Sequence, residues 1–86
     1  MSYQLKFSSS FEKQLKKLHP KDAKRIVEEI KSLQADPFPK GKKVKNLVGV
    51  PNAWRIRSGK VRAIYFVDET IKTIFIEDVA YRKDIY

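Results

Sequence analysis

The sequence has 86 residues, of which 42% are hydrophobic and 34% are charged, and it carries a formal net charge of +9. This composition is typical of one globular domain and excludes a disordered chain, while the absence of cysteine excludes disulfides, thiol catalysis and cysteine-based metal sites. Residues 1–7 contain no apolar run long enough for a signal peptide or a membrane span, so we expect a cytoplasmic protein.

A short strand and a helix are expected first. Residues 3–7 alternate aromatic or apolar side chains with polar ones, which is the period of a half-buried strand. Ser9 and Glu12 then have the spacing of a capping box, which predicts a helix over residues 10–18. Its apolar residues recur at helical intervals: Phe11, Leu15 and Leu18.

A second helix is expected directly after it. Pro20 suits the first turn of a helix, and His19 before it is expected to act as a cap or loop residue. One apolar stripe follows, formed by Ala23, Ile26, Val27, Ile30 and Leu33. Two consecutive helices of this length predict a helical hairpin.

The rest of the chain is β-rich. Residues 36–41 hold two prolines and a glycine, which predicts a loop that ends the second helix. Three β-prone runs follow, over residues 53–57, 61–67 and 71–79. The order β-α-α-β-β-β predicts an α+β fold: a small antiparallel sheet with the N-terminal helical hairpin packed on one face.

The positive charge is concentrated in one segment. Residues 37–67 contain eight Lys or Arg residues and no Asp or Glu, so this segment accounts for nearly the whole net charge. Such a field predicts a polyanionic ligand, most simply nucleic acid. The eight residues are Lys40, Lys42, Lys43, Lys45, Arg55, Arg57, Lys60 and Arg62.

Strand alternation predicts that a hairpin presents part of this charge on one face. A two-residue turn at Ser58 and Gly59 would pair Arg57 with Lys60, and Arg55 with Arg62. Like charges directly opposite each other cost about 0.2–1 kcal/mol per pair, a cost that a bound phosphodiester would offset. The alternative is a solvated outer face that resists edge association. The opposite face is expected in the core: Trp54, Ile56, Val61, Ala63, Tyr65 and Val67.

Four segments carry a resemblance to a known family. They are KVKNL (43–47), WRIR (54–57), VRAIY (61–65) and RKDIY (82–86), in this order after the helical hairpin. Over nearly the whole chain the sequence resembles the RelE/ParE superfamily of bacterial and archaeal toxins. The resemblance implies a single RelE-like toxin domain over residues 1–86, which belongs to a type II toxin-antitoxin system and is held inactive by a cognate antitoxin.

The resemblance also implies a site. RelE-like toxins cleave messenger RNA in the ribosomal A site, whereas ParE-like toxins inhibit DNA gyrase, and fold alone does not choose between these branches. The RelE-like catalytic positions correspond to Arg55, Arg57, Arg62, Arg82 and Tyr86, and all are filled, which favours the nuclease. The sequence departs from the family in two respects. Family members often have lysine at the positions of Arg55 and Arg57, and many continue into a further C-terminal helix where this sequence stops.

Cleavage of this kind is a transesterification in which the 2′-hydroxyl attacks the neighbouring phosphate. Arg62 and Arg82 are candidates to stabilise the charge on the phosphoryl oxygens, and Arg82 or Arg57 could assist departure of the 5′-oxygen. Arginine is effectively always protonated, so Tyr86 is the candidate proton acceptor. With one histidine, no cysteine and dispersed acids, we expect no metal and no other cofactor.

Further residues are expected to bind RNA. They are Lys40, Lys42, Lys43, Lys45, Lys60 and Tyr81. The expected partners are the ribosome with its messenger RNA, and the cognate antitoxin. The lysine run could instead be a solvated loop, Tyr81 could simply end a strand, and Tyr86 could pack on the sheet. Two other functions stay open: a ParE-like gyrase inhibitor and a nucleic-acid-binding module without enzymatic activity.

Overall fold

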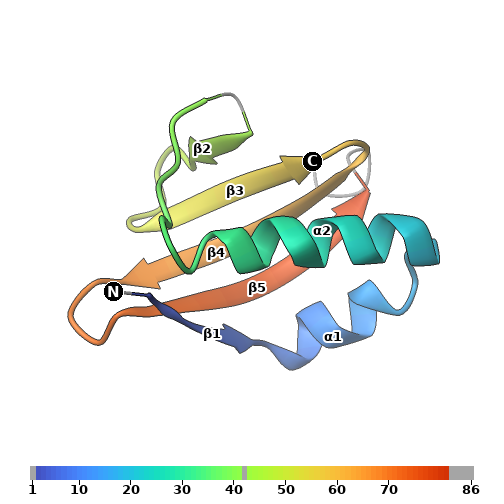
Figure 1. The fold of residues 1–86 in the computed structure, drawn as a ribbon, viewed down its shortest axis with the longest axis horizontal. Helices are drawn as coiled ribbons and strands as arrows, with labels where there is room; N and C mark the ends of the chain where they lie inside the picture. The colour runs from blue at the N-terminus through green and yellow to red at the C-terminus, as the bar shows by residue number, and fades with distance from the viewer. Residues whose placement is uncertain (1, 42, 82–86) are drawn as a thin grey trace.

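A computed structural model describes residues 2–41 and 43–81, and its helices pack on a twisted mixed sheet (Figure 1). The elements are β1 (Gln4–Phe7), α1 (Ser9–Leu15), α2 (Pro20–Ser32), β2 (Val44–Asn46), β3 (Ala53–Ser58), β4 (Val61–Asp68) and β5 (Thr73–Tyr81). The strand order within the described residues is β1-β5-β4-β3-β2, with β1 parallel to β5 and the other neighbours antiparallel. The predicted α+β class is confirmed.

The start of α1 differs by one residue from the prediction. Ser8, not Ser9, is the N-cap, and its hydroxyl accepts a hydrogen bond from the Phe11 amide at 2.9 Å. The Ser8 amide still donates to the Ile76 carbonyl of β5, so Ser8 is the residue at which the chain leaves the sheet and enters the helix. Helix α1 ends at Leu15, earlier than predicted, although Leu18 remains buried.

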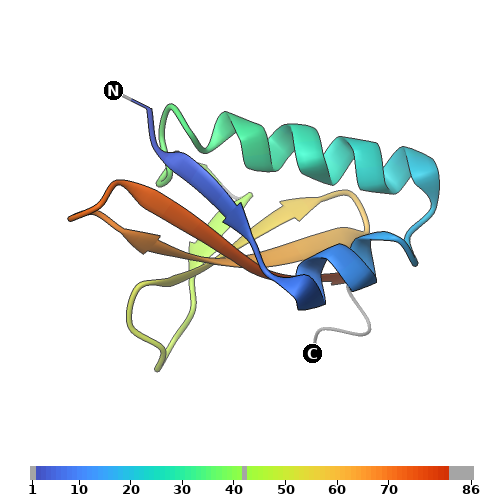
Figure 2. The ribbon, with the colours of Figure 1, turned by 90° about the horizontal axis from the view of Figure 1, so that it is seen from below.

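Helix α2 begins and packs as predicted. His19 is its N-cap, with Nδ1 accepting from the Lys21 amide at 3.2 Å, and Pro20 lies in the first turn. Ile26, Ile30 and Leu33 are fully buried, which confirms the apolar stripe. Figure 2 shows α2 lying along one face of the sheet, and α1 lies against β5.

Two features of the sheet were not predicted. Strand β2 pairs with β3 through Val44 opposite Ile56, but it has three residues and a single buried side chain, so its sequence carries too little alternation to be recognised. Strand β1 runs parallel to β5, with Leu5 opposite Ile74. A parallel pairing between the two ends of a chain depends on the intervening fold, and the local sequence does not encode it.

The predicted pairing of the β3–β4 hairpin is wrong. Arg57 lies opposite Arg62, and Gly59 and Lys60 form the turn. Gly59 has φ +60°, and the hairpin turn with one positive φ takes glycine at its first central position. The register differs from the predicted one by two residues, and because side chains alternate with a period of two, the predicted faces survive.

The inner face of the sheet forms the core with α2. Tyr65 is fully buried, and its hydroxyl donates to the Pro37 carbonyl at 2.7 Å. Trp54 packs against this core and against the Phe38 ring, with centroids 4.8 Å apart, which confirms its predicted place. Among the described residues, neither helix has the length and apolar character needed to cross a membrane.

Candidate nucleic-acid interface

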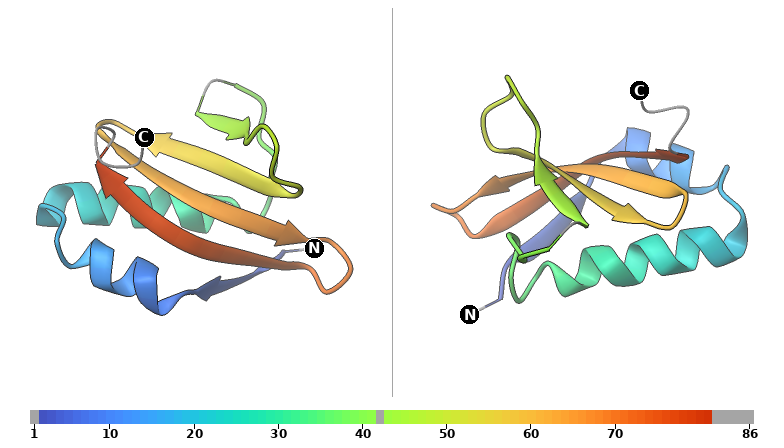
Figure 3. Two further views of the ribbon diagram at one scale, coloured as in Figure 1. Left: turned by 180° about the vertical axis from the view of Figure 1, so that it is seen from behind. Right: turned by 90° about the horizontal axis from the view of Figure 1, so that it is seen from above.

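The face of the sheet opposite α2, here called the open face, presents the basic residues of the central strands. Figure 3 shows this face in its left view, with α2 behind the sheet. Arg55 and Arg57 alternate with the buried Ile56 on β3, and Arg62 alternates with the buried Val61 and Ala63 on β4. Lys45 of β2 joins them because it lies opposite Arg55. The three arginines therefore share one face, as predicted.

Like charges face one another twice on the open face. Arg57 lies opposite Arg62, and Lys45 lies opposite Arg55. Neither predicted pair forms: the hairpin contains one like-charge pair, Arg57 with Arg62, and the second lies between β2 and β3 and was not predicted. Like charges directly opposite each other cost a sheet about 0.2–1 kcal/mol per pair, and an anion bound between them would relieve this repulsion.

The three arginines differ in exposure. Arg57 is exposed, Arg55 is half-buried, and Arg62 is only 6% exposed. A buried guanidinium keeps its charge, because arginine does not lose its proton in proteins. Arg62 is thus a fixed cation in a partly desolvated position, while Arg57 opposite it can reach into solvent.

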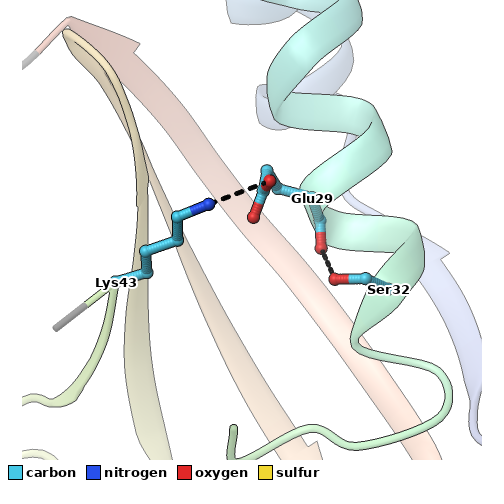
Figure 4. A network of polar contacts seen from close by, with 3 residues as sticks. All are labelled: Glu29, Ser32 and Lys43. Carbon is cyan, nitrogen blue, oxygen red and sulfur yellow. Dashed lines mark hydrogen bonds and ion pairs between the residues drawn. The ribbon is translucent and has the colours of Figure 1, made fainter. Parts of the chain in front are cut away.

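Lys43 has an acidic partner that the sequence did not reveal. Its Nζ lies 3.2 Å from Glu29 Oε1 on α2, and Figure 4 shows this ion pair beside the hydrogen bond from Ser32 Oγ to the Glu29 carbonyl. The Lys43 side chain is 65% exposed, so the pair is a weak surface interaction. Lys40 lies next to it and is also exposed. The basic segment contains no acid of its own, but the tertiary structure supplies one.

The hairpin end adds another cation. Lys60 is exposed in the turn and does not lie opposite Arg57, so that part of the predicted pairing is wrong. Arg25 of α2 approaches the same turn: its Nη1 lies 4.0 Å from the position that a Cβ on Gly59 would take. Nothing in the local sequence around Arg25 indicated this contact, because it depends on how α2 crosses the sheet.

Tyr81 connects the end of β5 to the start of α2 through hydrogen bonds. Its hydroxyl donates to Asp22 Oδ2 at 3.0 Å and accepts from the His19 amide at 2.9 Å. The ring is half-buried and packs against the core. The hydroxyl is therefore engaged within the protein, at the point where the strand ends.

A hollow of about 520 Å³ lies beside the arginine pair on the open face. Its floor includes Ile64 and Ala80, the latter directly opposite Arg62 on β5. Lys17, two residues after the end of α1, lines one wall, and Asp78 of β5 contributes a half-buried carboxylate. The Asp78 Oδ1 accepts a hydrogen bond from the Val79 amide, which stabilises this acid locally.

The predicted site residues fall into two groups. Arg55, Arg57 and Arg62 come together on adjacent strands, and Lys45 joins them on the open face. Lys43 instead pairs with Glu29 of α2, the Tyr81 hydroxyl is bonded to Asp22 of α2, and Lys40 and Lys60 lie outside the strands. Lys42, Arg82 and Tyr86 lie outside the described residues. The described geometry therefore contains three of the four predicted catalytic arginines.

Comparisons with known proteins identify the family of this chain. Residues 5–86 match the family model described as the ParE toxin of the type II toxin-antitoxin system parDE. The chain is 32% identical over 87 residues to a putative toxin RelE1 of Methanocaldococcus jannaschii, an alignment that covers 100% of this chain and 97% of that protein.

Solved structures are similar as well. The archaeal RelE–RelB complex from Pyrococcus horikoshii OT3 contains a chain with a TM-score of 0.82 and 30% identity, covering 95% of this chain and 97% of that one. The RelB–RelE antitoxin-toxin complex from Methanococcus jannaschii contains one with a TM-score of 0.76 and 32% identity, covering 93% of each chain.

Proposed function

Because this chain belongs to the RelE/ParE superfamily, as a toxin of the type II toxin-antitoxin systems, we propose that it cleaves messenger RNA in the ribosomal A site. The observation that carries this proposal is the directly opposed Arg57 and Arg62, with Arg55 beside them on the same face. The exposed Arg57 could contact a phosphodiester directly, with the charges of the half-buried Arg55 and the buried Arg62 beside it.

The proposed reaction is an attack of the 2′-hydroxyl on the adjacent phosphate, which gives a 2′,3′-cyclic phosphate and a free 5′-hydroxyl. The buried, fixed position of Arg62 suits stabilisation of the phosphoryl oxygens, since a preorganised donor is worth about 10²–10³ in rate. Arg57 and Arg82 are proposed to assist the leaving oxygen, and Tyr86 to accept the proton. Neither a metal nor another cofactor takes part in this scheme.

The proposed partners are the ribosome with its message, and an antitoxin. The two archaeal structures described above each pair the similar toxin chain with a RelB antitoxin, which supports an antitoxin partner for this chain. Lys40, Lys43, Lys45 and Lys60 would contact RNA phosphates and set the salt dependence of binding. In this proposal residues 1–86 act as one toxin domain in the cytoplasm.

Mapping RNA ends tests the proposal. A defined message is translated in a purified system with the protein added, and new 5′ ends are mapped by primer extension. We expect cuts within the A-site codon that are lost in Arg57→Ala, Arg82→Ala and Tyr86→Phe. Lys24→Ala, an exposed cation on α2, is the matched control and should cleave normally.

Inhibition of DNA gyrase is the second candidate, since the matching family model is that of the ParE toxin. An intact message combined with inhibited supercoiling in a gyrase assay would select this function. RNA binding with neither effect would identify a nucleic-acid-binding module without catalytic activity.

A further inference from the structure

Two aromatic side chains lie on the open face, away from the arginines. Phe66 of β4 lies directly opposite Phe75 of β5, and both rings are half-buried. Phe66 has the same strand parity as Arg62 and Ile64, so it points to the same side of the sheet. Within residues 2–41 and 43–81, neither phenylalanine belongs to the core cluster of buried residues.

The two phenylalanines line a hollow of about 480 Å³, within the range of ligand sites in proteins. Pro51 and Asn52, from the loop between β2 and β3, form another wall, and Figure 2 shows this loop projecting from the side of the sheet opposite α2. Asn52 has φ +59°, a left-handed conformation that is uncommon outside glycine. This residue lies at the rim of the hollow.

The hollow lies on the same face of the sheet as the arginines. Phe66 and Arg62 are four positions apart on β4, which corresponds to about 13 Å along a strand. Lys6 of β1 lies opposite Phe75 and adds a cation at the other side of the rings. Aromatic rings on the face of a sheet that also carries basic residues can stack the bases of a single-stranded nucleic acid.

The hollow also has acidic residues at its rim. Asp68 and Glu69 line it, and the Asp68 Oδ1 accepts hydrogen bonds from the Thr70 and Ile71 amides. These amides partly compensate the Asp68 charge. The rim disfavours a phosphate at this point, while an uncharged base contacting the rings is compatible with it.

We propose that Phe66 and Phe75 form a base-stacking subsite for single-stranded RNA whose backbone crosses the arginines of the open face. The inference rests on the RNA-binding role proposed above and adds to it a contact to a base that flanks the reacting phosphate. Stacking requires only the π-face of a base, so the subsite would strengthen binding with little sequence preference.

Binding to an RNA that cannot be cleaved tests this subsite. The probe is a fluorescently labelled single-stranded oligonucleotide with 2′-O-methyl groups, which lacks the attacking hydroxyl. We expect Phe66→Leu combined with Phe75→Leu to weaken binding about 5-fold to 100-fold, the factor of one lost base–aromatic stack. Phe66→Tyr keeps a ring and should bind like the original protein. Phe7→Leu, an exposed aromatic on β1 that stacks on Phe11, is the matched control.

A second probe distinguishes binding through the bases of the RNA from binding through its phosphate charge. An abasic oligonucleotide of the same length and charge should bind the leucine variant and the original protein equally. The proposal is overturned if the leucine variant binds the base-bearing probe normally, or if it loses both probes alike while melting at the normal temperature. It is also overturned if that variant keeps the RNA and instead loses a basic peptide ligand.

The outcome is independent of the proposed nuclease activity, because binding is measured without cleavage. A protein that stacks bases at Phe66 and Phe75 but leaves messages intact would retain the subsite and refute the nuclease. If the protein cleaves messages but the leucine variant binds RNA as well as the original protein does, the nuclease is retained and the stacking subsite is refuted.

Discussion

The Tyr81 hydroxyl donates a hydrogen bond to the Asp22 carboxylate at 3.0 Å, joining the last described residue of β5 to the first turn of α2. The same hydroxyl accepts from the His19 amide, so it also satisfies a backbone donor at the helix start. The strand that leads to Arg82 and Tyr86 is thereby attached to the helix layer.

Tyr81→Phe should destabilise the protein by about 1–2 kcal/mol, because it removes a hydrogen bond to a carboxylate and leaves the His19 amide without its acceptor. Chemical denaturation monitored by the Trp54 fluorescence measures the loss. Asp22→Asn keeps an acceptor for the tyrosine and should cost less. A Tyr81→Phe protein as stable as the original would show that this junction contributes nothing to folding.

Arg57→Ala should weaken RNA binding while leaving the fold intact or slightly stabilised. Its removal relieves repulsion with Arg62 worth about 0.2–1 kcal/mol, and it deletes one phosphate contact, which lowers the salt slope of binding by about 1. Filter binding over a range of salt concentrations, together with thermal melting, measures both effects. An unchanged salt slope would mean that Arg57 does not contact phosphate.

Glu29→Gln should tighten RNA binding about two- to five-fold at low salt, since it releases the exposed Lys43 from its ion pair. Stability should change little, because a surface pair of this kind is worth about 0–1 kcal/mol. Glu28→Gln removes the same charge from an exposed position one residue earlier on α2 and is the control. Equal effects of the two substitutions would indicate a general charge effect and no specific role for Lys43.

Stability should fall in alkaline solution, and Tyr65 should account for part of the decline. Burial, and secondarily the nearby Asp36 charge, raise the pKa of the Tyr65 phenol far above its ordinary value of 10.0. The unfolded chain therefore releases this proton at a lower pH than the folded protein does. The stabilisation that Tyr65 provides is complete below pH 10 and is lost as the pH rises above that value.

Denaturation of the original protein and of Tyr65→Phe between pH 7 and pH 11 tests this. At neutral pH the variant should be less stable by about 1–2 kcal/mol, because the buried Pro37 carbonyl loses its hydrogen bond. The difference between the two proteins should shrink above pH 10. Parallel pH profiles would contradict the assignment.

Sequence alternation was sufficient to predict which side chains of β3 and β4 face the helices and which face outward, although Lys60, predicted on the outward face, lies in the turn. The predicted register was wrong by two residues, yet Arg55, Arg57 and Arg62 still share a face, because a two-residue shift preserves the pleat. The apolar stripe of α2 and the helix start at His19 and Pro20 were predictable for a similar reason: periodicity and capping are local properties.

The partners of these residues were decided by the tertiary structure. Which cations stand opposite one another depends on the turn at Gly59, the acid beside Lys43 comes from α2, and the parallel pairing of β1 with β5 joins the two ends of the described chain. The alignment of Phe66 with Phe75 likewise depends on how β4 and β5 pair. Contacts between residues far apart in sequence form when the layers pack, so a linear pattern encodes the faces of the elements but not their neighbours.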